Sequence, residues 1–289
     1  KNYMNLITLF KKFPNEESCL RYIEHIRWNG QPTCPYCKGN KVSKHTELNR
    51  KDRLQCSSCQ KSFSVTVGTI FHHTHLDLRH WFYIICLMLN AKKGISAYQV
   101  ARDLEMRRMT AWSCMHKIRV AMGTEQKELL EGIFQMDETY IKTKDTDGNG
   151  GSGGKRPDNT PVVAISNEGK IKAVKAKNLM ASTLYGIARR TAKEGSTFYT
   201  DSSSAYGLFK NVFTHEKVKH AVEFVSKDGV HCNAVEGFWS LLKRGIKGNY
   251  HHISQKYLQN YINEFEFRYN NNQKEGLGFS EMIDRMLKV

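Results

Sequence analysis

The chain has 289 residues, and its 44 Lys and Arg residues against 28 Asp and Glu residues give a formal net charge of +16. This length predicts one sizeable core with one or two smaller modules beside it, and the positive charge favours a polyanionic partner such as nucleic acid. The longest apolar run, Trp81 to Leu89, is far shorter than the roughly 20 residues that span a bilayer, which argues against a membrane protein.

The positive charge is concentrated in the first part of the chain. Residues 1–125 hold 20 basic and 9 acidic side chains, whereas the remainder holds 24 and 19. The opening residues lack the apolar stretch of a signal peptide, so we expect a cytoplasmic protein.

Four of the eight cysteines form two C-x2-C pairs with 18 residues between them: Cys34, Cys37, Cys56 and Cys59. This spacing is typical of tetrahedral zinc sites, and four thiolates fill the coordination shell. We therefore expect a structural zinc ion in a ribbon over residues 31–72, after a helical lead-in over residues 1–30. Redox activity of a C-x2-C pair is the alternative. The single cysteines are expected to be small buried hydrophobes: Cys19, Cys86, Cys114 and Cys232.

Residues 76–124 have a helical pattern. Apolar residues recur at steps of three and four after Asp77, which can cap the first helix. A turn at residues 92–94 precedes a second helix that Ser96 can cap, and a third is predicted from Arg107 to Val120, with Met109 among the apolar residues spaced for burial. A helix-turn-helix-like arrangement favours DNA binding. We expect four basic side chains to contact DNA: Arg107, Arg108, Lys117 and Arg119.

From residue 130 the pattern changes, which predicts a separate α/β domain over residues 130–289. Strands are predicted at residues 133–141, 162–165, 171–174 and 196–200, with a helix at residues 181–191. The glycine-rich stretch at residues 145–159 is expected to be the loop of a hairpin between the first two strands.

Two carboxylates lie on these predicted strands, Asp137 within the first and Asp201 at the end of the last. Nearby carboxylates repel each other unless a cation neutralises them. Converging carboxylates can hold two Mg²⁺ ions that act on a phosphodiester, so both aspartates are predicted metal ligands. Glu138 is expected on the opposite sheet face because side chains alternate along a strand.

Glu236 is the predicted third ligand. It lies on an amphipathic helix beside the apolar stripe formed by Val235, Phe238, Trp239 and Leu242. Asn233, one turn earlier, is the alternative, although an amide cannot neutralise Mg²⁺ as a carboxylate does.

Basic residues follow the third ligand. Lys243 comes seven residues, or two helical turns, after Glu236, so it is expected on the same face and in contact with the scissile phosphate or flanking DNA. Arg244 extends this basic character, with a plain solvated face as the alternative. Tyr250 can stack on a base or simply pack, and His231 can orient substrate or serve only as a hydrogen-bonding residue.

Four segments accompany the paired C-x2-C motifs: FSVTVGTIFHHTHLDLRHWF, QMDETY, FYTDSSSAY and HCNAVEGFWSLLKRGIKGNYHHIS. With 34 residues between Asp201 and Glu236, this combination resembles the DDE transposases of bacterial insertion sequences, specifically the zinc-ribbon group akin to Merlin elements. The resemblance spans nearly the whole chain. It implies an RNase H-like catalytic domain, strand cleavage dependent on Mg²⁺ (or Mn²⁺), and transfer of the freed 3′-hydroxyl to target DNA.

The expected partners are double-stranded DNA of two kinds, the terminal inverted repeats of the element and the target. Synapsis of two ends predicts a homodimer or higher oligomer on DNA, associated with the nucleoid of a bacterial cytoplasm. Two other functions fit parts of the sequence. A non-catalytic zinc-ribbon DNA-binding regulator leaves the carboxylates unused, and an RNase H-like nuclease would cleave without strand transfer.

Overall fold

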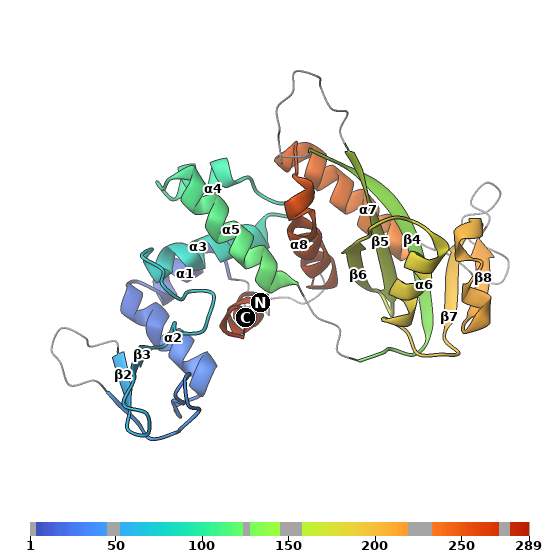
Figure 1. Ribbon diagram of the computed structural model, residues 1–289. Helices are drawn as coiled ribbons and strands as arrows, with labels where there is room; N and C mark the ends of the chain where they lie inside the picture. Colours follow the sequence, from blue (N-terminus) through green and yellow to red (C-terminus); the bar gives the residue numbers. More distant parts are fainter. Residues whose placement is uncertain are drawn as a thin grey trace, which may run out of the picture. The chain divides into compact units, whose positions relative to one another are not determined.

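The computed structural model describes residues 4–44, 53–123, 128–144, 158–218, 233–271 and 278–288. The chain forms two compact units (Figure 1). Unit 1 comprises Lys1–Met122 and Lys274–Val289, and unit 2 comprises Gly123–Gln273. The chain therefore leaves unit 1, builds unit 2, and returns.

Unit 1 begins with α1 (Leu6–Lys12) and α2 (Glu16–Trp28). Asn15 starts α2 with a capping box, in which its side chain accepts from Ser18 N at 2.9 Å. A three-stranded antiparallel sheet follows, with strands β1 (Val42–Lys44), β2 (Arg53–Cys56) and β3 (Ser62–Ser64). One cysteine pair lies in a turn before β1, and the other begins at the end of β2.

Three helices form the next part of unit 1: α3 (Leu78–Asn90), α4 (Ala97–Asp103) and α5 (Arg108–Met122). Asp77 and Ser96 cap α3 and α4 as the sequence predicts, accepting from Arg79 N at 2.8 Å and from Gln99 N at 3.1 Å. Met109 differs from prediction, because its side chain is 64% exposed on α5.

The last helix, α9 (Gly278–Leu287), belongs to unit 1. The sequence pattern predicts that residues 274–289 belong to the α/β domain. In the structure, the apolar face of α9 is instead buried in unit 1. Ile70 N donates to Met286 O at 3.1 Å, and Arg285 Nη1 donates to Met122 O at 3.1 Å. Periodicity shows that such a helix has an apolar face but not which core that face joins.

Unit 2 is built on a five-stranded sheet in the order β6-β5-β4-β7-β8. The strands are β4 (Ile133–Thr143), β5 (Asp158–Asn167), β6 (Lys170–Lys175), β7 (Thr197–Asp201) and β8 (Thr214–Val218). The first three form an antiparallel meander, and β7 and β8 run parallel to β4 on its other side. This order and these directions are those of an RNase H-like fold, as the family resemblance implies. The hairpin of β4 and β5 is confirmed, while residues 145–157 of its loop lie outside the described residues.

Helices cover the two faces of the sheet. On one face, α6 (Ala181–Arg189) packs with two short 3₁₀ helices, Ser204–Tyr206 and Phe209–Asn211. On the other, α7 (Asn233–Gly245) and α8 (Leu258–Asn271) bury their apolar sides (Figure 1). A π-helical turn, Ile246–Tyr250, and a 3₁₀ turn, Gln255–Tyr257, connect these two helices. Among the described residues, no helix has the length and apolar character needed to cross a membrane.

Candidate catalytic and zinc sites

The four cysteines of the ribbon converge on one point. Their Sγ atoms all lie within 4.8 Å of one another, with Cys34 and Cys59 3.7 Å apart and Cys37 and Cys56 3.6 Å apart. A tetrahedral zinc ion with Zn–S bonds of about 2.3 Å places its sulfur atoms about 3.8 Å apart. The four thiols therefore fit a closed structural zinc site.

Each C-x2-C pair sits in a tight turn, and the two turns are built alike. In each, the first cysteine donates its N–H to the residue five positions on and accepts from the residue four positions on. The four bonds are Cys34 N to Gly39 O at 2.9 Å, Lys38 N to Cys34 O at 3.0 Å, Cys56 N to Lys61 O at 3.1 Å, and Gln60 N to Cys56 O at 2.9 Å. Lys38 and Gln60 both adopt the left-handed conformation, with φ of 60° and 58°.

Gly39 is required by space in the first turn. A Cβ atom there would lie 3.2 Å from Ser58 Oγ and 3.3 Å from Cys37 Sγ.

In the second turn, the backbone N–H of Cys59 lowers the pKa of the Cys56 thiol to about 6. Because zinc binds the thiolate form, this backbone N–H assists metal binding by Cys56.

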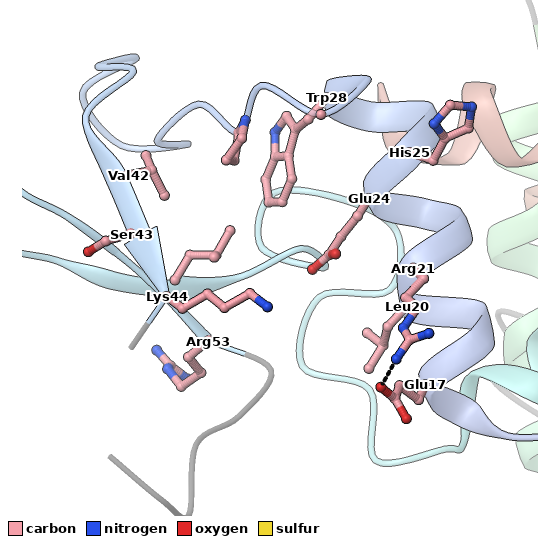
Figure 2. A pocket seen from close by; sticks show the side chains of 13 residues that line it. Glu17, Leu20, Arg21, Glu24, His25, Trp28, Val42, Ser43, Lys44 and Arg53 are labelled. Atoms are coloured by element: carbon pink, nitrogen blue, oxygen red, sulfur yellow. Dashed lines mark hydrogen bonds and ion pairs between the residues drawn. The ribbon is translucent and has the colours of Figure 1, made fainter. Parts of the chain in front are cut away.

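A pocket of about 490 Å³ lies between α2 and the ribbon sheet (Figure 2). Lys44 and Arg53 line its sheet side, while Glu17 and Glu24 line its helix side. Figure 2 shows the side chains of Lys44 and Glu24 pointing toward each other across it. Since acidic groups face the basic ones, the pocket lacks the uniform positive charge that a phosphate site needs.

Asp137 and Asp201 lie on the same face of neighbouring strands in unit 2. The parallel register of β4 and β7 pairs Phe134 with Phe198, and both rings belong to the core under α6. Each aspartate comes three positions after its phenylalanine, so it points to the opposite face, which α7 and α8 cover. Both aspartates are partly exposed.

Helix α7 approaches this pair with Glu236 in its first turn. Trp239, one turn after Glu236, donates from Nε1 to Asp137 Oδ2 at 2.9 Å. Ala234 N donates to Gln135 Oε1 at 3.1 Å, which ties the start of the helix to the same strand. Glu236 is partly buried, whereas Asn233 is exposed at the first position of the helix.

The three carboxylates do not converge as closely as the cysteines do. Within the part of the chain that the structure describes, the four cysteines are the one group of three or more Cys, His, Asp or Glu that meets the geometry of a metal site. The charges of Asp137 and Asp201 nevertheless both affect the pKa of Glu138. Burial raises the pKa of Glu138 above its usual value, and the negative charges of Asp201 and Asp137 raise it further.

Glu138 itself lies on the α6 face, as strand alternation predicts. Its carboxylate accepts a hydrogen bond from the hydroxyl of Tyr206, which is fully buried in the core on that face. Sequence reasoning missed this contact and the bond from Trp239 to Asp137. The sequence did offer one signal. Buried Trp and Tyr side chains usually form a hydrogen bond through the indole N–H or the phenol O–H, so a partner was to be expected for each.

The basic residues predicted to follow Glu236 are accessible. Lys243 and Arg244 are exposed in the last turn of α7, where Arg244 Nε donates to Ser240 O at 3.0 Å. Tyr250 packs instead of presenting its ring: its hydroxyl donates to Glu264 at 3.0 Å, and its ring centroid lies 4.7 Å from that of Tyr261. His231 and Cys232 lie outside the described residues.

The predicted DNA contacts of unit 1 divide into two groups. Arg107, Arg108 and Lys117 are exposed at and along α5. Arg119 is 1% exposed, so the prediction that it contacts DNA is not supported by its position. Arg119 lies one turn after Met115 on the buried face of the helix, and its long aliphatic stem allows a charged residue to occupy such a face.

Two family models match the chain. The ISXO2-like transposase domain matches residues 129–270, and the transposase zinc-ribbon domain matches residues 14–62. An uncharacterized protein in transposable element ISH50 of Halobacterium salinarum is 26% identical over 275 residues, which are 89% of this chain and 92% of the relative. An uncharacterized transposase-like protein of Haemophilus influenzae is 28% identical over 105 residues, 36% of this chain and 84% of the relative.

Among solved structures, the Mos1 strand transfer complex is similar to this chain with 13% identity and a TM-score of 0.30, over 71% of this chain and 75% of that one. The strand order and strand directions of unit 2 define an RNase H-like fold, with Asp137 and Asp201 on one face of its sheet. The matches to the two family models identify the family. The chain belongs to the zinc-ribbon DDE transposases of insertion sequences, in the group with an ISXO2-like transposase domain.

Proposed function

We propose that this transposase binds the ends of its insertion sequence, cleaves a phosphodiester bond there, and transfers the 3′-hydroxyl ends to target DNA. Cleavage adds water at the scissile phosphorus and breaks its bond to the 3′-oxygen, which leaves a 3′-hydroxyl. That hydroxyl then attacks a target phosphorus and displaces the 3′-oxygen of the target strand. The number of phosphodiester bonds is thus conserved in the joining step.

The observation that carries this proposal is the placement of Asp137 and Asp201 on one face of two adjacent parallel strands, with the helix of Glu236 held against that face. Carboxylate oxygens are the ligands that Mg²⁺ and Mn²⁺ prefer. The charges of Asp201 and Asp137 also add to the rise that burial causes in the pKa of the neighbouring Glu138. We assign the metal ligands as Asp137, Asp201 and Glu236. Two bound Mg²⁺ ions would activate the attacking oxygen and stabilise the leaving oxygen.

The remaining assignments concern DNA. Lys243 and Arg244 are exposed at the end of α7, and we assign them to phosphates near the scissile bond. Arg107, Arg108 and Lys117 are exposed on the helical segment of unit 1, which we assign to the terminal repeats. Bringing two ends together requires at least a dimer on DNA, and the substrate places the protein at the bacterial nucleoid.

The test is incubation of the full chain with Mg²⁺ and duplex DNA that carries the terminal inverted repeats of the element. We expect nicking at the repeat ends and joined products with target DNA. Asp201→Asn should keep DNA binding and lose cleavage, because it removes a charge from the metal site but not from the exposed basic surfaces. Arg190→Gln, a change of exposed charge in the same unit, serves as the control.

The outcomes separate the competing functions. Binding with no nicking by the unaltered chain would contradict the catalytic proposal and favour a DNA-binding regulator. Nicking with no joined product would favour a nuclease without strand transfer. Unaltered cleavage by Asp201→Asn would remove the acidic triad from the mechanism.

A further inference from the structure

Trp239 connects the strand of the first predicted metal ligand to the helix of the third. Its indole Nε1 donates to Asp137 Oδ2 at 2.9 Å across 102 positions of sequence. The ring itself is 5% exposed and lies in the core between the sheet and α7, with its centroid 5.2 Å from that of Phe238. Packing therefore fixes the direction in which the N–H points.

The position of Trp239 on α7 gives this bond a second consequence. Glu236 precedes Trp239 by three residues, so the two side chains lie on adjacent turns of one helix face. The bond from Ala234 N to Gln135 fixes the first turn against the same strand, two positions before Asp137. The two bonds together set the register of α7, and hence of Glu236, over Asp137.

The chemistry of the donor also suits a metal ligand. An indole N–H is uncharged and donates one hydrogen bond, so it orients a carboxylate without neutralising it. A Lys or Arg at the same place would supply a positive charge that competes with a cation. Hydrogen bonds to ligating carboxylates are known to set ligand orientation and metal affinity.

We propose that Trp239 is a positioning residue of the metal site, which orients the Asp137 carboxylate toward the divalent cation and holds Glu236 in register with it. This inference rests on the proposed function of the three carboxylates. Its effect should appear in cation affinity and in the cation concentration that cleavage requires.

The experiment compares Trp239→Phe with the unaltered chain. Phenylalanine keeps an aromatic ring in the core and removes the N–H donor. Mn²⁺ binding to the full chain is followed by electron paramagnetic resonance, and the Asp201-dependent part is taken as the catalytic site. We expect Trp239→Phe to weaken this binding by about 10- to 100-fold, and the Mg²⁺ concentration for half-maximal end cleavage to rise in parallel. High Mg²⁺ should restore much of the cleavage rate.

Phe238→Leu is the matched control, because Phe238 is fully buried in the same cluster and its ring makes no hydrogen bond. It should lower the melting temperature while leaving Mn²⁺ affinity near that of the unaltered chain. A purely structural role for Trp239 predicts the same behaviour for both variants. Equal Mn²⁺ affinity in Trp239→Phe and the unaltered chain would overturn the inference.

A second measurement uses the unaltered chain and does not depend on the variant folding. The chain has four tryptophans, and Trp28, Trp81 and Trp112 are all in unit 1. In an NMR titration, the Trp239 indole N–H signal should broaden at lower Mn²⁺ than the other three. Asp201-dependent Mn²⁺ binding without this selective broadening would overturn the positioning role alone. An absence of Asp201-dependent Mn²⁺ binding would overturn the proposed function and this role with it.

Discussion

Asn270 of α8 pairs with Ile171 of the edge strand β6 through both ends of its side-chain amide. Ile171 N donates to Asn270 Oδ1 at 2.7 Å, and Asn270 Nδ2 donates to Ile171 O at 2.8 Å. Glu266 and Gln259 continue the pattern along the same edge at Ala173 and Lys175. Side chains of α8 thus take the place of a neighbouring strand, and they satisfy backbone groups that an open edge leaves exposed.

Asn270→Ala should loosen this edge. Losing both bonds to Ile171, which is 2% exposed, should lower the free energy of local opening at β6 by about 2 kcal/mol. Hydrogen exchange at the β6 amides measures this change. Asn211→Ala, at an exposed position of the same unit, should leave β6 exchange unaltered. Equal exchange in Asn270→Ala and the unaltered chain would show that water replaces the amide without loss.

Zinc removal should unfold the ribbon, because its own core holds little beyond Phe63 and the cysteines themselves. Cys56→Ser is expected to abolish stoichiometric zinc and to lose the ordered signal of the ribbon in NMR spectra. Cys114→Ser is the matched control, since Cys114 is a buried thiol of α5 outside the zinc group, and it should keep one zinc per chain. One tightly held zinc in Cys56→Ser would contradict the four-cysteine site.

Two arginines of α5 should behave differently when truncated. Arg108→Ala removes an exposed charge and should weaken binding to terminal-repeat DNA, with the salt slope falling by about 1. Arg119→Ala removes a buried side chain and should lower the melting temperature instead. Binding titrations at several salt concentrations, together with thermal unfolding, separate these effects. A lower salt slope in Arg119→Ala with unchanged stability would reverse the assignment.

Glu236→Gln and Asn233→Ala decide between the two candidates for the third ligand. Glu236 offers a charge on the side of α7 that Trp239 directs to Asp137, whereas Asn233 is exposed at the start of the helix. We expect Glu236→Gln to lower end cleavage by more than about 100-fold, beyond the usual effect of losing an outer hydrogen-bond partner. Asn233→Ala should have a much smaller effect. The opposite order of effects would identify Asn233 as the ligand.

The buried single thiols should resist alkylation in the folded protein. Burial raises the pKa of Cys19 to about 12 and the pKa values of Cys86 and Cys114 to about 11, so at neutral pH they remain protonated and unreactive. Mass spectrometry after brief alkylation should find these three modified only in denaturant. Modification of Cys86 in native buffer, at the rate of a free thiol, would show that α3 opens readily.

Local patterns predicted much of the fold. The caps at Asp77 and Ser96, the strand containing Asp137 and the cysteine pairs all depend on neighbours within a few positions, and the structure confirms them. The prediction that the single cysteines are buried is confirmed for Cys19, Cys86 and Cys114.

The features that sequence reasoning missed depend on contacts between distant segments. Arg119 and Met109 occupy helical positions whose pattern does not reveal which side of α5 meets α3 and α4. The bond from Trp239 to Asp137 forms only when α7 has packed against the sheet, because its two ends are 102 positions apart. Spacing and resemblance were enough to propose the three carboxylates as ligands. They do not predict the distances between the three side chains.

The return of α9 to unit 1 has a consequence for the order in which the protein is made. Domains generally fold as units during synthesis, starting from the N-terminal side. Unit 2 is continuous in sequence and can fold as it leaves the ribosome, whereas unit 1 lacks the helix that covers its core until translation has passed through unit 2. A ribosome that stops early would release a chain with a foldable RNase H-like domain and an incomplete zinc-ribbon unit. Such a product would expose apolar surface to chaperones and proteases, so stable folding of the zinc-ribbon unit depends on translation of α9.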